Sequence, residues 1–125
     1  MTHPVVRWQI ISPNPDATTG FYKQLFGWSS SKDNALGYRE VGTGPGSIDG
    51  GVWPAPPGVP AFVQLFVAVP DVERHIARAI ALGATMLVPT SVLPDGDSMA
   101  VLQDPSGLSF AVCTMKPTPE PATTA

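Results

Sequence analysis

The sequence WQIISPNPD, at residues 8–16, has a counterpart in VQLFVAVPD, at residues 63–71. In each stretch an apolar run ends in Pro-Asp, and a glutamine (Gln9 or Gln64) stands seven residues before the aspartate. Similarity of this kind between two halves of a chain is typical of an internally repeated fold. The two stretches therefore predict that the chain contains one structural unit written twice.

A helical pattern that ends in glycine follows each Pro-Asp. The first places Ala17, Phe21 and Leu25 on one face, and the second does the same with Val72, Ile76, Ala79 and Ile80. We expect Asn14 or Asp16 to cap the first helix and Asp71 the second, because a short side-chain oxygen accepts the unpaired N–H groups there. Gly27 and Gly83 are expected to end the two helices. Phe21, Leu25 and Ile76 are expected in the core.

Short extended segments follow both helices, separated by turns rich in Gly, Pro and Asp. They are expected at 28–31 (the weakest signal), 37–41, 47–53, 85–88, 98–102 and 108–114. The resulting order predicts an α+β fold of two βαβββ modules, at about residues 5–54 and 60–115. Helices would cover the outer face of one curved mixed sheet or half-open barrel, leaving an inner face around a cavity. We expect a single domain over 1–115 and a disordered Pro-rich tail over 116–125.

The bulk composition narrows the class of protein. A chain of 125 residues fits one domain, and a net charge of -3 gives no basic surface for nucleic acid. No apolar run approaches the ~20 residues of a membrane span, and no signal peptide is visible. The single cysteine, Cys113, argues against a disulfide framework and fits a reducing compartment. We expect a cytoplasmic protein that contacts neither membrane nor nucleic acid.

Four segments resemble one known group of proteins. They are FYKQLFGW at 21–28, GGVW at 50–53, LGA at 82–84 and DPSGLSF at 104–110. In order and spacing they resemble the vicinal oxygen chelate superfamily, which contains glyoxalase I, bleomycin-resistance proteins and extradiol dioxygenases. The likeness covers about residues 5–115. It implies a homodimer, and a divalent metal held by up to four His, Glu or Gln side chains from the first and last strands of each module.

The positions that would hold this metal carry poor ligands. Gln64 stands at the first-strand position of the second module, and either Gln9 or Arg7 stands at that of the first. Ala111 stands where the family's glutamate is expected, and the first module's last strand offers Asp49, Gly50 or Gly51. Neutral amides are weak ligands and a nearby guanidinium repels a cation. We therefore predict a cavity with no metal and no cofactor, the best remaining set being Gln9, Asp49 and Gln64.

Strand alternation places Arg7 and Gln9 on the cavity face and Val6, Trp8 and Ile10 on the helix-facing side. Arg7 is either an anchor for a carboxylate, phenolate or quinone oxygen, or a partner of Glu40 or Asp49 in a salt bridge. Gln9 and Gln64 are expected to face each other, contacting either a ligand or only one another. The residues expected to line a ligand site are Arg7, Gln9, Trp53, Phe62, Gln64, Phe66, Ala111 and Cys113, although aromatic clusters are more often plain core.

These residues leave three functions open. The first is a metal-free protein that encloses a planar aromatic or natural-product-like small molecule, of the sequestration or resistance type. The second is a metal-independent isomerase, cyclase or lyase, with Arg7, Glu40 and Asp49 as candidate catalytic groups and Cys113 as a further one. The third, a metal-dependent glyoxalase or dioxygenase, is disfavoured by the absent His and Glu ligands. Whether the protein is an enzyme stays open, and we prefer the binding protein because no convincing general base is visible.

Overall fold

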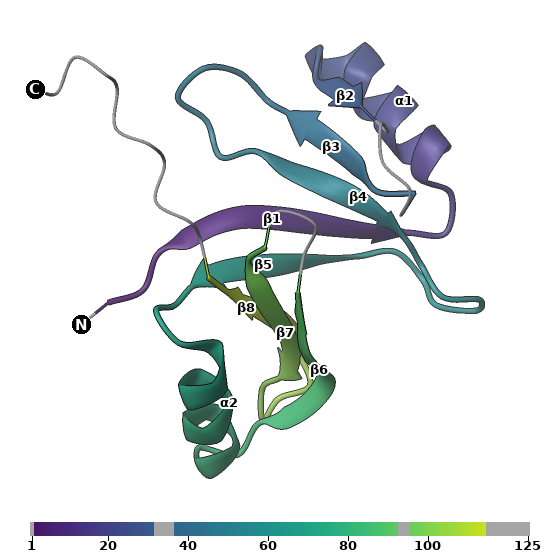
Figure 1. Ribbon diagram of the computed structural model, residues 1–125. Helices are drawn as coiled ribbons and strands as arrows, with labels where there is room; N and C mark the ends of the chain where they lie inside the picture. The colour runs from purple at the N-terminus through teal and green to yellow at the C-terminus, as the bar shows by residue number, and fades with distance from the viewer. Residues whose placement is uncertain (1, 32–36, 93–95, 115–125) are drawn as a thin grey trace, which may run out of the picture. The chain divides into compact units, whose positions relative to one another are not determined.

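The structure is a computed structural model, and it describes residues 2–31, 37–92 and 96–114 (Figure 1). The predicted tail at 116–125 lies outside the described residues. The elements follow in the order β1 (Val5–Ser12), α1 (Pro15–Phe26), β2 (Ser29–Ser31), β3 (Arg39–Gly42), β4 (Gly50–Pro54), β5 (Phe62–Ala68), α2 (Val72–Ala81), β6 (Thr85–Val92), β7 (Ser98–Gln103) and β8 (Ser109–Cys113). The α+β class and the βαβββ order, twice over, are confirmed.

The chain divides into two compact units, Met1–Val67 and Ala68–Ala125. The division does not coincide with the sequence repeat, because nearly all of β5, the first strand of the second module, belongs to unit 1. No described helix is long and apolar enough to cross a membrane.

Unit 1 contains a mixed sheet in the order β2-β3-β4-β1-β5 (Figure 1). Strand β1 runs parallel to β4 and antiparallel to β5, while β3 pairs antiparallel with both β2 and β4. The register places Gln9 between Gly51 on one side and Gln64 on the other. Strand β1, between β4 and β5, therefore carries the glutamine that the repeat singled out.

Helix α1 begins and ends as its sequence predicts. Asn14 is the N-cap, with its Oδ1 accepting from the Ala17 N–H at 3.1 Å. Asp16, the other candidate cap, instead accepts a hydrogen bond from Arg39 Nη2 at 3.0 Å. Gly27 adopts φ 74, a left-handed conformation that favours glycine, and its N–H donates to the Lys23 carbonyl at 2.8 Å.

The predicted core face of α1 is wrong. Phe21 and Leu25 are 59% and 58% exposed, and no residue of this helix is fully buried. The helix instead turns Tyr22 toward the sheet, where its ring stacks on Trp28 at a centroid distance of 5.1 Å. Trp28 in turn lies 5.6 Å from the ring of Trp8 on β1. The side of the helix that meets the sheet is therefore the one with Tyr22, and not the predicted one with Phe21 and Leu25.

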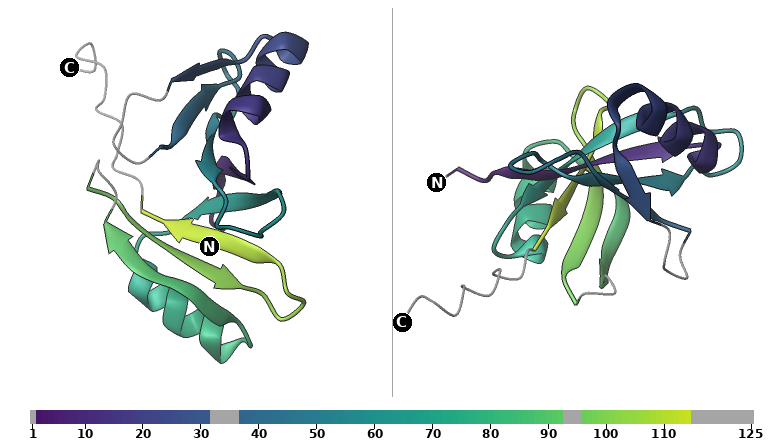
Figure 2. Two further views of the ribbon diagram at one scale, coloured as in Figure 1. Left: turned by 90° about the vertical axis from the view of Figure 1, so that its right-hand side faces the viewer. Right: turned by 90° about the horizontal axis from the view of Figure 1, so that it is seen from above.

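Unit 2 contains α2 and three antiparallel strands in the order β8-β7-β6, with α2 packed along β6 and β7 (Figure 2). Asp71 caps α2 by accepting from the Arg74 N–H at 3.1 Å, and Ile76 is buried, as predicted. Ala100, Leu102 and Ala111 have no exposed surface. The core of this unit is therefore wholly aliphatic at its centre.

The β7–β8 turn is built around Asp104. Its Oδ1 accepts hydrogen bonds from the Ser106 N–H at 2.8 Å, the Ser106 hydroxyl at 2.7 Å and the Leu108 N–H at 3.0 Å. These bonds, first of all those from Ser106 and Leu108, lower the pKa of Asp104 from its ordinary 3.8. The Asp-Pro-Ser-Gly segment thus forms the turn that the sequence indicates.

Candidate functional site

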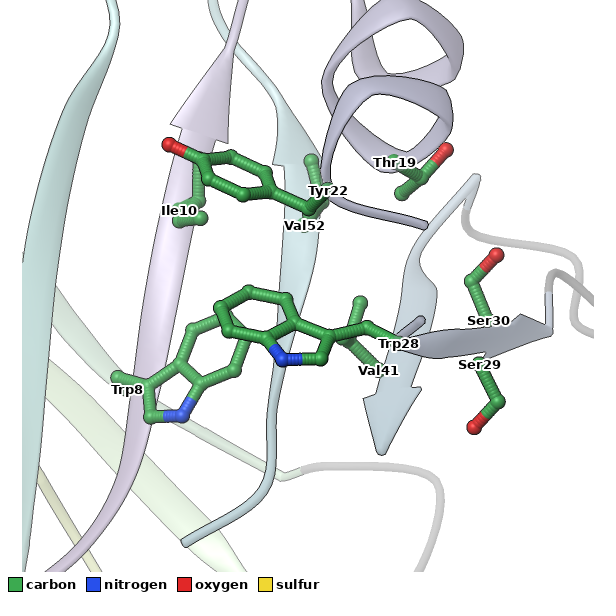
Figure 3. A pocket seen from close by; sticks show the side chains of 9 residues that line it. All are labelled: Trp8, Ile10, Thr19, Tyr22, Trp28, Ser29, Ser30, Val41 and Val52. Atoms are coloured by element: carbon green, nitrogen blue, oxygen red, sulfur yellow. The ribbon is translucent and has the colours of Figure 1, made fainter. Parts of the chain in front are cut away.

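The sheet of unit 1 has two faces, and the one toward α1 is filled around Trp8 and Trp28. We call it the helix face; around its gap with α1 and β2 lie Trp8, Ile10, Thr19, Tyr22, Trp28, Ser29, Ser30, Val41 and Val52 (Figure 3). The space left between these side chains is about 10 Å³, room for about one water molecule. The Trp8 indole N–H donates to the Ile48 carbonyl at 2.9 Å. This part of the helix face is packed, whereas an open groove of about 420 Å³ lies farther along it, lined by Ile10, Ala17, Thr18, Phe21, Tyr22, Ala61, Phe62 and Val63.

The opposite face carries most of the predicted site residues of unit 1. We call it the polar face, and define it by Arg7, Gln9, Tyr38, Trp53, Gln64 and Phe66. Gln9 and Gln64 lie directly opposite one another in the β1–β5 ladder and are only 3% and 8% exposed. The predicted pairing of the two glutamines is confirmed, and counting back from Asp16 gives the correct register. Buried amides of this kind need hydrogen-bond partners.

Tyr38 is the centre of the polar face, and sequence reasoning missed it. Its hydroxyl accepts hydrogen bonds from Arg7 Nη2 and from Gln9 Nε2, the latter at 3.2 Å. Its ring lies 4.5 Å, centroid to centroid, from the ring of Trp53. Its place follows from the register of the folded strands: Tyr38 precedes Glu40 by two residues, and Glu40 pairs with Gly51, which itself pairs with Gln9.

Two consecutive glycines, Gly50 and Gly51, leave space for a large side chain on each face of the sheet. A Cβ at Gly51 would overlap the hydroxyl and ring of Tyr38, so only glycine leaves space for this side chain across β4. A Cβ at Gly50 would overlap the backbone carbonyl and indole of Trp8 on the other side of the sheet. The Gly-Gly pair therefore serves both faces, one residue each.

The polar face holds buried polar atoms that are not paired. Among the described residues, Gln9 Oε1 and Arg7 Nε have no hydrogen-bond partner. Arg7 Nη2 reaches only Tyr38 and, at 3.4 Å, the Gly50 carbonyl. An amide oxygen accepts and a guanidinium N–H donates. The site thus keeps both kinds of hydrogen-bonding capacity unused, which is costly in a protein interior.

The salt bridge considered for Arg7 is not present within the described part of the chain. Glu40 is exposed on β3, and the Asp49 carboxylate accepts from the Thr43 N–H at 3.0 Å in the turn before β4. No carboxylate within the described ranges lies within ion-pair distance of Arg7. The positive charge of Arg7 is therefore shared with a phenol hydroxyl and a carbonyl and is not neutralised.

The polar face does not suit a divalent metal ion. Gln9 and Gln64 offer neutral amides, Gly51 offers no side chain, and Asp49 is held in an exposed turn. The guanidinium of Arg7 lies on the same face and repels a cation. No group of three His, Cys, Asp or Glu within the described ranges could hold a metal. Hard divalent ions prefer several charged oxygen ligands, which this face lacks.

The remaining predicted site residues lie in different places. Trp53 lies within β4, in the segment expected to be extended, and it pairs with Ile11. Phe66 is buried opposite Arg7, whereas Phe62, half-buried, also borders a groove with Phe21 and Tyr22 of α1. Ala111 and Cys113 are buried in β8 of unit 2. Unit 1 alone therefore brings together Arg7, Gln9, Trp53, Gln64 and Phe66, with Tyr38 added.

Comparison with known proteins identifies the family. The profile of the glyoxalase-like domain family matches residues 8–113. The chain belongs to this family, and its fold is the vicinal oxygen chelate fold.

The curated relatives and the similar structures carry several different names. The chain is 32% identical over 115 residues to "Putative glyoxylase CFP32" of Mycobacterium tuberculosis (strain CDC 1551 / Oshkosh), covering 90% of this chain and 43% of that protein. The chain thus spans less than half the length of this curated relative. The fold is similar to BH1468 from Bacillus halodurans C-125 (TM-score 0.70, 14% identity, 97% and 100% of the two chains covered). It is also similar to methylmalonyl-CoA epimerase from Mycobacterium tuberculosis (TM-score 0.64, 14% identity, 94% and 93% covered). At these identities the structures show the fold alone.

Proposed function

We propose that the polar face binds a planar, partly aromatic small molecule without a metal ion, and that the protein holds this molecule unchanged. The observation that carries the proposal is that buried Gln9 and half-buried Arg7 each keep an unpaired polar atom, next to Tyr38 and the ring of Trp53. A flat ring can lie against the ring of Trp53, which offers an aromatic contact that Tyr38 makes at 4.5 Å in the structure. Polar atoms of the ligand would then meet Arg7 Nε and Gln9 Oε1.

A metal-independent enzyme is the second candidate, and one observation favours it. The Tyr38 hydroxyl accepts from two donors, one of them a guanidinium, which is an arrangement suited to passing a proton to or from a bound substrate. The earlier catalytic candidates are weaker, since Glu40 is exposed and Asp49 is held by Thr43. The name of the relative CFP32 and the epimerase among the similar structures are consistent with an enzyme, but neither supplies a substrate for this chain.

Native mass spectrometry of the purified protein, with elemental analysis of the same sample, tests the proposal. A set of planar aromatic compounds is offered, and each retained compound is released and its mass and isomeric form measured. The binding protein retains a compound, returns it unchanged and carries no stoichiometric divalent ion. A changed compound would establish the enzyme instead. A stoichiometric metal ion would contradict both candidates.

A further inference from the structure

Tyr38 occupies a position that is built to hold a phenol. Its oxygen accepts from Arg7 and Gln9, its ring lies against Trp53, and Gly51 leaves the space in which the ring and hydroxyl fit. No carboxylate within the described ranges competes for Arg7. Arg7, Gln9, Gly51 and Trp53 therefore provide donors, space and a ring contact for one hydroxylated aromatic ring.

We infer that the ligand of the polar face carries a phenolate-type oxygen on a planar ring, and that Tyr38 is its intramolecular competitor. This inference rests on the proposed function and names the class of ligand for it. A phenolate oxygen would accept from the same Arg7 and Gln9 donors, and its negative charge would pair with the guanidinium that Tyr38 leaves un-neutralised. The ligand's ring would take the place of the Tyr38 ring beside Trp53.

The backbone next to Tyr38 is compatible with its displacement. Gly37 adopts φ 73, in the left-handed region that glycine enters without steric cost. The residues around Tyr38 belong to strands, since Arg7 and Gln9 lie on β1 and Gly51 and Trp53 on β4. Binding would therefore displace the Tyr38 side chain, while the residues on β1 and β4 stay in place.

If Tyr38 competes with the ligand, a substitution of Tyr38 should strengthen ligand binding and not weaken it. Tyr38→Phe removes the hydroxyl that occupies the donors and keeps a ring, so the ligand no longer has to break the Arg7–Tyr38 hydrogen bond. We expect about tenfold tighter binding of 4-nitrophenolate by Tyr38→Phe than by the wild type, since a hydrogen bond to a charged group is strong enough for such a factor. Tyr38→Ala, which also vacates the ring position, is expected to bind at least as tightly as Tyr38→Phe.

The experiment is a titration with 4-nitrophenol at a pH at which its phenolate dominates, with binding followed by the absorption of the probe. Tyr22→Phe, which removes a phenol hydroxyl on the helix face, is the matched protein control and should bind as the wild type does. 4-Nitrotoluene, with a methyl group in place of the oxygen, is the matched probe control and should bind at least tenfold more weakly. Benzoate tests a carboxylate at the same position.

The outcomes distinguish a failure of the phenolate inference from a failure of the proposed binding function. Tighter binding by Tyr38→Phe, with loss of binding in Arg7→Met, supports the phenolate inference. Unchanged or weaker binding by both Tyr38 variants overturns it, and so does a preference for benzoate or equal binding of 4-nitrotoluene, while the proposed binding function stands. Failure of the wild type and of both Tyr38 variants to bind any planar aromatic compound would overturn the inference and the proposed function together.

Discussion

Alternate residues of the same strands make up the two faces of the unit 1 sheet, yet one face carries packed aromatic rings and the other carries polar atoms without partners. On the helix face the rings of Trp8, Tyr22 and Trp28 stack on one another and leave room for about one water molecule. On the polar face Arg7 and Gln9 are held inside with atoms unpaired. A fold that needed only stability would fill both faces with apolar side chains. The difference is what the proposed ligand-binding function requires of the polar face.

Gly50→Ala tests the helix face and has the largest expected effect. The new Cβ would overlap the Trp8 carbonyl, and a backbone atom of a central strand cannot rotate away. We expect a loss of about 3 kcal/mol in the free energy of unfolding, at the upper end of ordinary overpacking. Urea denaturation measures it. A loss below about 1 kcal/mol would show that β1 and β4 are not in the close register described.

A pair of helix substitutions tests which face of α1 is packed. Tyr22→Ala removes a ring that stacks on Trp28, and we expect it to cost about 2 kcal/mol. Phe21→Ala changes a side chain that is 59% exposed, and we expect less than about 0.5 kcal/mol. The two variants differ by one position and are compared in the same denaturation experiment. A larger loss of stability in Phe21→Ala than in Tyr22→Ala would show that the helix packs on the face predicted from the sequence.

Gly51→Ala tests the polar face with a smaller expected cost. Its Cβ meets the far end of the Tyr38 side chain, which can shift, so we expect a loss of about 1 kcal/mol. The displacement of Tyr38 from Trp53 should change the near-ultraviolet circular dichroism. Gly20→Ala is the control, because a Cβ there meets nothing within 4 Å, and it should be neutral or stabilising. An unchanged spectrum in Gly51→Ala would argue against the contact between Tyr38 and Trp53.

Asp104→Asn, in an exposed turn outside both faces, has the smallest expected effect. The pKa of Asp104 is lowered in the folded state, so its charge stabilises the fold above its ordinary value of 3.8. That contribution is lost as the pH falls through the lowered pKa. The variant should therefore be slightly less stable than the wild type at neutral pH, and the difference should disappear in acid. Thermal melts at several pH values check this, and a difference that grows in acid would contradict it.

The order of elements could be predicted because local signals fix it. The Pro-Asp repeat, the caps at Asn14 and Asp71 and the left-handed Gly27 each depend on neighbours within a few residues. Strand alternation then placed Arg7 and Gln9 on one face and Trp8 on the other, as the structure has them.

The predictions that failed concern features that depend on contacts between residues far apart in the sequence. The rotation of α1 depends on Tyr22 meeting Trp28 and Trp8, which the spacing of Phe21 and Leu25 does not reveal. Tyr38 reaches Arg7 and Gln9 from about thirty residues away, over a glycine in a third segment. Arg7 forms no ion pair with Asp49, because Thr43 holds the Asp49 carboxylate in the turn before β4. None of these contacts has a local sequence signal.

The three tryptophans of the chain divide between the two faces, with Trp53 on the polar face and Trp8 and Trp28 on the helix face. A titration with 4-nitrophenolate, followed through the indole N–H signals in a ¹⁵N–¹H correlation spectrum, therefore tests directly which face binds. We predict a saturable shift of the Trp53 signal while those of Trp8 and Trp28 stay in place. Shifts confined to Trp8 and Trp28 would place the ligand on the helix face and contradict the central claim.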